Sequence, residues 1–204
     1  MGLPDDAAAA SGDPQPFVRQ ARLVDAEAFA AVQHRSWVRG AEHVALPPPP
    51  PREDMQRAWE RAITVPPSSR HHSFVAVDRS ADGEVVRGIA ASTPASDPDL
   101  DAERCVEVVV LAVEPDARGR GHGSRLVTAL VDVAVDEGAE EAVTWVAVDD
   151  DATRQFLEGC GWAADGAFRT LSTDDPDQAP GSELRQVRLA TALVDADASD
   201  QGTR

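Results

Sequence analysis

Apolar residues recur at three- and four-residue spacing in two N-terminal segments, 26–40 and 52–64, as they do along one face of a helix. Asp25 comes directly before the first segment and suits a helix N-cap. The proline run 46–51 separates the segments and is either a stiff connector or a proline-rich ligand motif. The pattern therefore predicts two helices, preceded by a short strand near 17–23.

From residue 73 onward the spacing becomes that of strands. Two alternating runs, 73–78 and 84–92, flank the turn residues 81–83 and predict a hairpin. The next run, 105–113, is apolar at nearly every position, which is typical of a strand covered on both faces. Beyond it the pattern predicts a helix, a strand, a short helix and a last pair of strands, at 126–137, 142–148, 151–158, 168–171 and 184–189.

Helices and strands in this order predict a single α/β domain over 16–190. The terminal segments, 1–15 and 191–204, are polar or acidic and have no apolar period. We expect both terminal segments to be disordered.

Charge narrows the choice of function. The chain has 36 acidic residues against 19 basic ones, all arginine, for a formal net charge of −17. This balance argues against binding nucleic acids through their phosphates, which requires a basic face. No window reaches the roughly 18 apolar residues of a membrane helix, and the N-terminus lacks the pattern of a secretory signal. Two cysteines suit a reducing cytosol. We expect a cytoplasmic protein with no metal, nucleic-acid or membrane partner.

A glycine-rich loop at 118–124 joins the apolar run 105–113 to an amphipathic helix. Glycines let successive backbone amides point inward, and a helix N-terminus adds partial positive charge, so such a loop can hold phosphate. The loop is not a dinucleotide fingerprint, because the third glycine would fall on Ser124, and it is not a P-loop, because no GK[ST] follows. A plain structural turn remains the alternative from the loop alone.

The sequence around this loop resembles the acyl-CoA-binding motif of the GCN5-related N-acetyltransferase (GNAT) family. That motif is an apolar strand, then V-x-P, then [QR]-x-x-G-x-[GA] at the start of a helix. Val113 and Pro115 match the first pair. The later fixed positions are matched by Arg118, Gly121 and Gly123.

A second match lies downstream, where Phe156, Gly161 and Trp162 fit the end of the family's short helix. The two segments together cover about residues 103 to 170. The resemblance implies the GNAT fold, a mixed sheet of about six or seven strands flanked by about four helices. In that fold two parallel strands splay apart and form the acyl-CoA cleft.

The resemblance also implies acetyl-CoA as cofactor, with CoA as product. Its pantetheine arm would pair with the backbone of Leu111, Ala112 and Val113. Its pyrophosphate end would contact Arg118, Gly119, Arg120, Gly121, His122, Gly123 and Ser124. The arginines of the loop, with Arg125, form a basic cluster that would attract the anion, or else they belong to a solvated helix start.

Acyl transfer to an amine requires a base, because an amine with a pKa of roughly 10 is protonated at neutral pH. Glu107 is the main candidate, as a lone carboxylate in an apolar strand, and strand alternation would put it on one face with Val109, Leu111 and Val113. A partly solvated strand position is the alternative reading of Glu107. Glu103 is a second candidate for the base. The N–H of Leu111 is the candidate for polarising the thioester carbonyl.

Two positions depart from the family pattern. Asp151 stands where the family has an asparagine at the start of the short helix, and it suits an N-cap there. Leu157 stands where the family has a tyrosine that acts as acid toward the CoA sulfur, and the chain contains no tyrosine. The carboxylate of Asp151 would still lie near the cofactor, but no phenolic acid is available.

These features together predict an N-acetyltransferase that uses acetyl-CoA and a small-molecule primary amine, by direct attack in a ternary complex. The alternatives are a non-catalytic acyl-CoA-binding regulatory module and an acetyltransferase that acts on protein amines. The resemblance leaves the oligomeric state open, a homodimer included.

Overall fold

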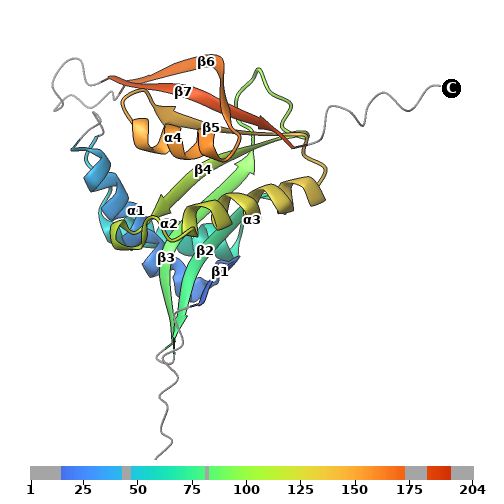
Figure 1. Ribbon diagram of the computed structural model, residues 1–204. Coiled ribbons are helices and arrows are strands. Elements are labelled where there is room, and N and C mark those ends of the chain that lie inside the picture. Colours follow the sequence, from blue (N-terminus) through green and yellow to red (C-terminus); the bar gives the residue numbers. More distant parts are fainter. Residues whose placement is uncertain (1–14, 43–46, 81–82, 173–182, 194–204) are drawn as a thin grey trace, which may run out of the picture.

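The computed structural model describes residues 15–42, 47–80, 83–172 and 183–193. They form one sheet of seven strands in the order β1-β2-β3-β4-β5-β7-β6 (Figure 1). The strands are β1 (Gln15–Gln20), β2 (His72–Ser80), β3 (Gly83–Pro94), β4 (Cys105–Val113), β5 (Glu141–Ala147), β6 (Ala163–Ser172) and β7 (Glu183–Ala192). Neighbouring strands are antiparallel except β4 and β5, which are parallel. The predicted α/β fold with a mixed sheet is confirmed.

Helices cover both faces of the sheet (Figure 1). The four helices are α1 (Ala26–Gly40), α2 (Arg52–Thr64), α3 (His122–Asp136) and α4 (Asp151–Gly159). On one face Phe29 of α1 packs with Val75 and Ile89 of the sheet, and its ring lies 4.1 Å from that of Trp59 in α2. On the other face Leu126 of α3 packs into the larger core with residues of α4. Each helix thus buries the apolar stripe that predicted it.

The sheet extends slightly beyond the expected domain ends. Gln15 pairs with Arg79 and begins β1, and Ala192 pairs with Glu141 at the end of β7. Both residues lie in segments that we expected to be disordered, and pairing with a neighbouring strand orders them. The rest of 1–15 and nearly all of 191–204, like most of the turn at 81–83, lie outside the described residues.

Strands β4 and β5 separate after a short paired stretch. They pair only at Cys105, Val106 and Glu107 of β4, opposite Glu141 to Val143 of β5. Just beyond this stretch the hydroxyl of Thr144 donates to the carbonyl of Val108 at 2.8 Å. From there to Val113, β4 pairs only with β3 within the described chain. The edge of β4 that faces β5 is therefore open, as the resemblance implied.

A β-bulge in β4 overturns the expected orientation of Glu107. Ser92 of β3 pairs with Val108 and Ala91 pairs with Val110, so Val109 is an extra residue without a partner in β3. An extra residue shifts the alternation of side chains by one position. Val110 therefore packs with the α1 and α2 side of the core, while Leu111 packs on the α3 side. Glu107 does not share a face with Leu111 and Val113.

Two predicted helix caps differ in the structure, because Asp25 holds the N-cap position of α1 without a side-chain hydrogen bond to the helix, and Asp151 is not the N-cap of α4. Asp25 lies in a 3-10 turn, Leu23–Asp25, that runs directly into α1, and its carboxylate turns back to pair with Arg19 at 2.7 Å. At α4 the N-cap is Asp150, which accepts a hydrogen bond from the N–H of Thr153. Asp151 is the first helical residue and pairs with Arg154. The cap of α4 was thus predicted one residue too late. The helix α1 follows a 3-10 turn directly and has no side-chain cap.

None of the helices in the described ranges is both long enough and apolar enough to cross a membrane.

Candidate active site

The glycine-rich loop forms a turn of free backbone amides at the start of α3. After a 3-10 turn, Pro115–Ala117, the chain passes through Gly119 and Gly121 with φ angles of 74° and 80°. These left-handed angles favour glycine. In the described part of the chain, no carbonyl or side chain accepts a hydrogen bond from the N–H groups of 118–124, and α3 has no side-chain N-cap. The amides are thus available to an anion.

Three arginines surround this turn without carboxylate partners. Arg118, Arg120 and Arg125 form no ion pair with any residue that the structure describes, although most other arginines do. Arg118 reaches the carbonyl of Val113, and Arg125 donates to the carbonyl of Arg120 at 2.9 Å. Unpaired cations at a helix N-terminus oppose the helix dipole, so they indicate an anionic ligand rather than a contribution to stability.

Packing under the loop requires the smallest residue at Gly123. A Cβ atom there would lie 3.0 Å from the ring of Phe156 in α4. Gly123 thus lets α3 and α4 approach each other directly below the turn. This contact explains why both predicted motif segments are needed for one site, since the second segment supplies Phe156.

The side chain of His122 does not face the expected cofactor position. It is 1% exposed, and neither ring nitrogen has a hydrogen-bond partner in the described structure. Its nearest acidic atom is Oδ1 of Asp78, 3.4 Å from Nε2. Burial lowers the pKa of His122, the charge of Asp78 opposes this, and Arg125, Arg120 and Arg87 lower the pKa further. Only the backbone N–H of His122 can serve the loop.

We expect His122 to make the protein less stable in mild acid. Because its folded pKa lies below the ordinary 6.5, the unfolded chain binds more protons, and stability falls as the pH drops through and below that value. In urea unfolding between about pH 7 and pH 5, His122→Gln should lose less stability than the wild type. His71→Gln, at a residue that contacts Ser68 near the surface, is the control. If the free energy of unfolding changed equally with pH in all three proteins, the lowered pKa of His122 would be contradicted.

Glu107 lies where β4 and β5 begin to separate. It is 6% exposed and is the last residue of β4 that pairs with β5. Its Oε2 accepts hydrogen bonds from the N–H and the hydroxyl of Ser96, at 3.3 and 2.9 Å. Its Oε1 accepts none from the described residues. One oxygen is thus held in place, while the other is available to a substrate. The second candidate, Glu103, has an 89% exposed side chain and lies apart from the cleft.

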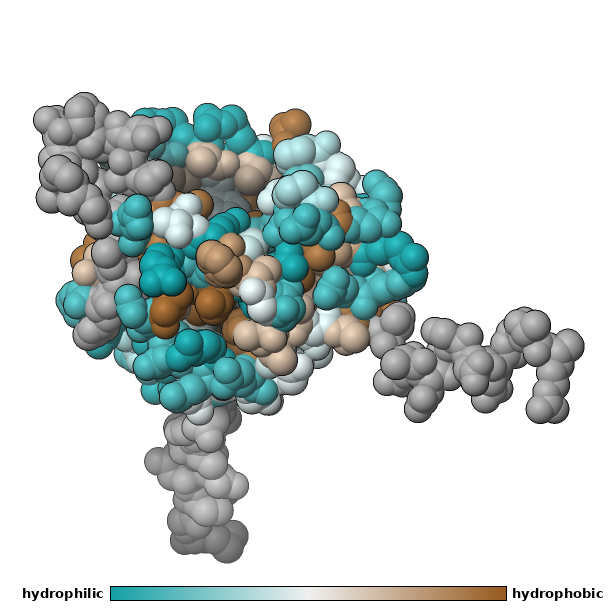
Figure 2. Space-filling model, turned by 90° about the horizontal axis from the view of Figure 1, so that it is seen from above, coloured by the Kyte–Doolittle hydropathy of each residue, from teal (hydrophilic) through white to brown (hydrophobic). Residues whose placement is uncertain are grey.

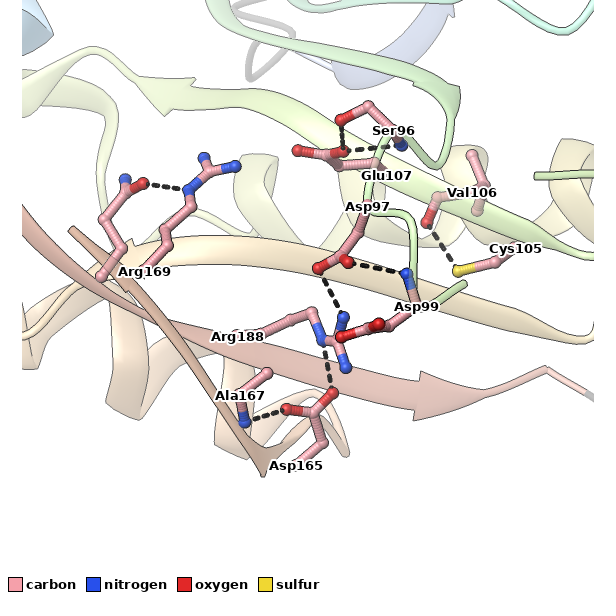
Figure 3. A network of polar contacts seen from close by, with 11 residues as sticks. Ser96, Asp97, Asp99, Cys105, Val106, Glu107, Asp165, Ala167, Arg169 and Arg188 are labelled. Carbon is pink, nitrogen blue, oxygen red and sulfur yellow. Dashed lines mark hydrogen bonds and ion pairs between the residues drawn. The ribbon is translucent and has the colours of Figure 1, made fainter. Parts of the chain in front are cut away.

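A pocket of about 510 Å³ lies beside Ser96, the residue whose hydroxyl donates to the Glu107 carboxylate. It is lined by Ser96 to Asp99, by Trp145 of β5 and by Gly166 to Arg169 of β6. Figure 2, seen from above the view of Figure 1, shows hydrophobic residues interspersed with hydrophilic ones on this side of the molecule. Figure 3 shows the Ser96 and Glu107 pair beside Arg169 and Arg188.

Arg188 holds the walls of this pocket together. Its guanidinium pairs with Asp97 of the β3–β4 loop at 2.7 Å and with Asp165 of β6 at 2.6 Å (Figure 3). Asp165 is available because β6 bulges between Ala164 and Phe168. Arg188 could not be predicted from the sequence, because two aspartates far apart in the chain define its role.

The position of the family tyrosine is buried in this chain. Leu157 is 2% exposed and packs in the main core with Val146 and Trp162. The same cluster contains Val108 of β4, so Leu157 belongs to the core that lies against both parallel strands. Asp151 is paired with Arg154 and is exposed on α4.

The two free cysteines differ in environment and should differ in reactivity. Burial raises the pKa of Cys105 to about 12, and Cys105 is 2% exposed, whereas Cys160 is half-buried. Because the thiolate is the reactive form, we expect Ellman's reagent to modify Cys160 alone in the folded protein. A Cys160→Ser variant should therefore react only after unfolding in urea. Rapid labelling of that variant in the folded state would contradict the burial of Cys105.

Comparisons with known proteins agree with this geometry. Residues 32–162 match the family described as acetyltransferase (GNAT) family. A mycothiol acetyltransferase from Mycolicibacterium gilvum (strain PYR-GCK) is 34% identical over 122 residues, which make up 60% of this chain and 37% of that protein. This chain thus covers well under half of the length of that relative.

Solved structures share the fold. An N-acetyltransferase from Staphylococcus aureus Mu50 superposes with a TM-score of 0.66 at 18% identity, over 88% of this chain and 99% of that one. A phosphinothricin acetyltransferase from Sinorhizobium meliloti, in complex with AcCoA, superposes with a TM-score of 0.65 at 17% identity, over 92% and 95%. The resemblance in the sequence is confirmed: the chain belongs to the GNAT family of acetyltransferases.

Proposed function

We propose that this protein transfers the acetyl group of acetyl-CoA to a primary amine of a small molecule, by direct attack in a ternary complex. The observation that carries the proposal is the position of Glu107. Its carboxylate lies where β4 and β5 separate, and Ser96, which donates to one of its oxygens, lines the pocket that Trp145 and Arg169 also line.

The residues present fit acetyl-CoA. Free amides at 118–124 and the unpaired Arg118, Arg120 and Arg125 provide an anion site for its pyrophosphate. The open edge of β4 at Leu111, Ala112 and Val113 provides backbone groups for its pantetheine arm. When bound, acetyl-CoA supplies an acyl thioester that is reactive toward amines.

The chain's own groups then have separate tasks. Glu107 removes a proton from the acceptor amine, directly or through water, and Ser96 keeps the carboxylate oriented. The N–H of Leu111, beyond the bulge at Val109, donates to the oxygen on which negative charge develops. With Leu157 buried and no tyrosine in the chain, solvent protonates the leaving thiolate. A missing general acid reduces the rate by roughly 10² to 10⁴ at most, so turnover survives.

A small-molecule acceptor is favoured over a protein amine. The pocket beside Glu107 is about 510 Å³ and is bounded by the loop Ser96 to Asp99 on one side and by β6 on the other. A volume of this order suits a small ligand. The name of the mycothiol acetyltransferase relative also supports a small molecule.

An acetyl-CoA-dependent thiol-release assay tests the proposal. The panel contains spermidine, kanamycin, the standard amino acids and a peptide with a free N-terminus. We expect release with at least one small amine and a product that gains one acetyl group by mass spectrometry. Release with the peptide alone would indicate a protein acetyltransferase. Tight CoA binding without release for any amine would indicate a regulatory module and contradict the proposal.

A further inference from the structure

The pocket beside Glu107 contains an arginine that the structure leaves without an acidic partner. Arg169 projects from β6 on the same face as Gln186 of β7, and its Nε donates to the Gln186 Oε1 at 2.7 Å. Its two terminal nitrogens donate to no described residue, and no carboxylate of the described chain lies within 4.0 Å of them. Arg188, on the same face, differs because Asp97 and Asp165 neutralise it.

Trp145 fixes the direction of this guanidinium. The Arg169 Cζ lies 4.3 Å from the centre of the Trp145 ring, which stands on β5 directly beside β7. Together with the Gln186 bond, this contact holds the planar group and leaves its terminal edge free. A planar, fixed guanidinium edge is suited to bind a carboxylate through two parallel hydrogen bonds.

The half-buried charge of Arg169 is costly without a ligand. Burial lowers its pKa, and only the more distant charges of Glu107 and Asp97 oppose that effect. A cation that is withdrawn from water without a paired anion destabilises the folded protein. Such an arrangement is typical of a binding site rather than of a structural ion pair.

Arg169 lines the pocket, and Glu107 lies next to it, behind Ser96. Figure 3 shows the terminal nitrogens of Arg169 pointing toward the carboxylate of Glu107. The Oε2 atom of that carboxylate accepts a hydrogen bond from the hydroxyl of Ser96. The pocket therefore contains one positive group without an acidic partner among the described residues, and the carboxylate of Glu107 lies next to it. Asp97 also lines it, but Arg188 neutralises that carboxylate.

We propose that the acceptor is a zwitterion, a small molecule that carries a carboxylate close to its primary amine, as an amino acid does, and that Arg169 binds this carboxylate. The inference rests on the proposed function and specifies its substrate class. The amine then points toward Glu107 while the carboxylate lies against Arg169. A polyamine or an aminoglycoside would instead place a positive charge against Arg169 and bind poorly.

Matched pairs of substrates test the inference. We expect wild-type kcat/KM to be at least about tenfold higher for one or more standard L-amino acids than for the corresponding primary amides, since a charge-assisted bidentate pair is lost in the amide. Arg169→Gln should remove this preference by raising KM for the amino acid, with little change for the amide. Arg169→Lys should restore part of it.

Arg185→Gln is the matched control. Arg185 lies on β7 next to Gln186, so its side chain points to the opposite face of the sheet, and it lines no part of this pocket. We expect Arg185→Gln to retain the preference for amino acids over their amides. Calorimetry should give wild-type CoA affinity for both Arg169→Gln and Arg185→Gln. Three results would overturn the inference without touching the proposed function: equal kcat/KM for amino acids and their amides in the wild type, a higher kcat/KM for spermidine, or equal losses of kcat/KM on both substrates in Arg169→Gln. Absence of turnover with every amine would instead defeat the proposed function.

Discussion

Acetyl-CoA affinity should fall by about 100-fold or more in Gly121→Val, which corresponds to roughly 3 kcal/mol of binding free energy. Gly121 has a φ of 80° and is the residue before α3, so a β-branched side chain there strains the turn. A Cβ atom at this position would also lie 2.7 Å from Nη1 of Arg125 and would displace that guanidinium. Both effects disturb the amides and charges assigned to the pyrophosphate. Isothermal titration calorimetry with acetyl-CoA measures the loss.

Gly138→Val separates backbone strain from loss of the anion site. Gly138 follows the other end of α3 with a φ of 82°, and nothing lies within 4 Å of a Cβ built there. The two variants should therefore lose similar stability in a thermal melt, but only Gly121→Val should lose CoA affinity. Unchanged affinity in a folded Gly121→Val protein would show that the loop is not the cofactor site.

The second large effect is expected at Glu107. Glu107→Gln should lower kcat/KM for the best amine by roughly 10² to 10⁴, because the amide cannot accept the proton of the acceptor. The glutamine keeps an oxygen that can accept the hydrogen bonds from Ser96, so the local fold should persist. CoA affinity should stay nearly constant, and the pH profile of kcat/KM should lose its acidic limb. Steady-state kinetics over a pH series, with calorimetry for CoA, provides both readouts.

Glu103→Gln is the comparison for this variant. Glu103 has an 89% exposed side chain, and its nearest described cation is Arg70 at 3.6 Å. We expect its kinetics to match the wild type. An unaltered pH profile in Glu107→Gln, or an equal loss in both variants, would assign the base to water or to another group.

The period of the apolar residues was enough to predict the helices and most of the strands. The segments 26–40 and 52–64 are α1 and α2 as predicted, because each has a single apolar face to bury. The glycine-rich loop was also visible in the sequence, although the loop alone left a plain structural turn open and only the resemblance of its surroundings assigned it to acyl-CoA. These features depend on the spacing of residues that are close together in the chain, and a single sequence shows that spacing directly.

The bulge at Val109 could not be read from the sequence. In the run 105–113 almost every residue is apolar, so a shift of one position leaves no trace in the pattern. Alternation then placed Glu107 with Leu111, on the wrong face. The one-residue shift in side-chain alternation is seen only in the pairing of β4 with β3.

The pocket wall was missed for a different reason. Trp145, Arg169 and Arg188 come from three strands that are distant in sequence and neighbours only in the sheet. A single arginine or tryptophan in a strand forms no motif. The one available signal was the presence of two arginines, Arg185 and Arg188, inside the run 184–189, which indicates a strand face that is not purely core.

The most direct test of acetyl transfer at this cleft is a single-turnover experiment with acetyl-CoA labelled at the acetyl carbonyl with carbon-13. The protein is incubated with one equivalent of the labelled compound, with and without the best amine, and intact protein and small molecules are analysed by mass spectrometry. We expect acetyl-CoA to remain intact without amine and the label to appear on the amine nitrogen, with none on the protein and little transfer by Glu107→Gln. Label on the protein, or label that stays on acetyl-CoA with every amine, would contradict direct transfer to an amine.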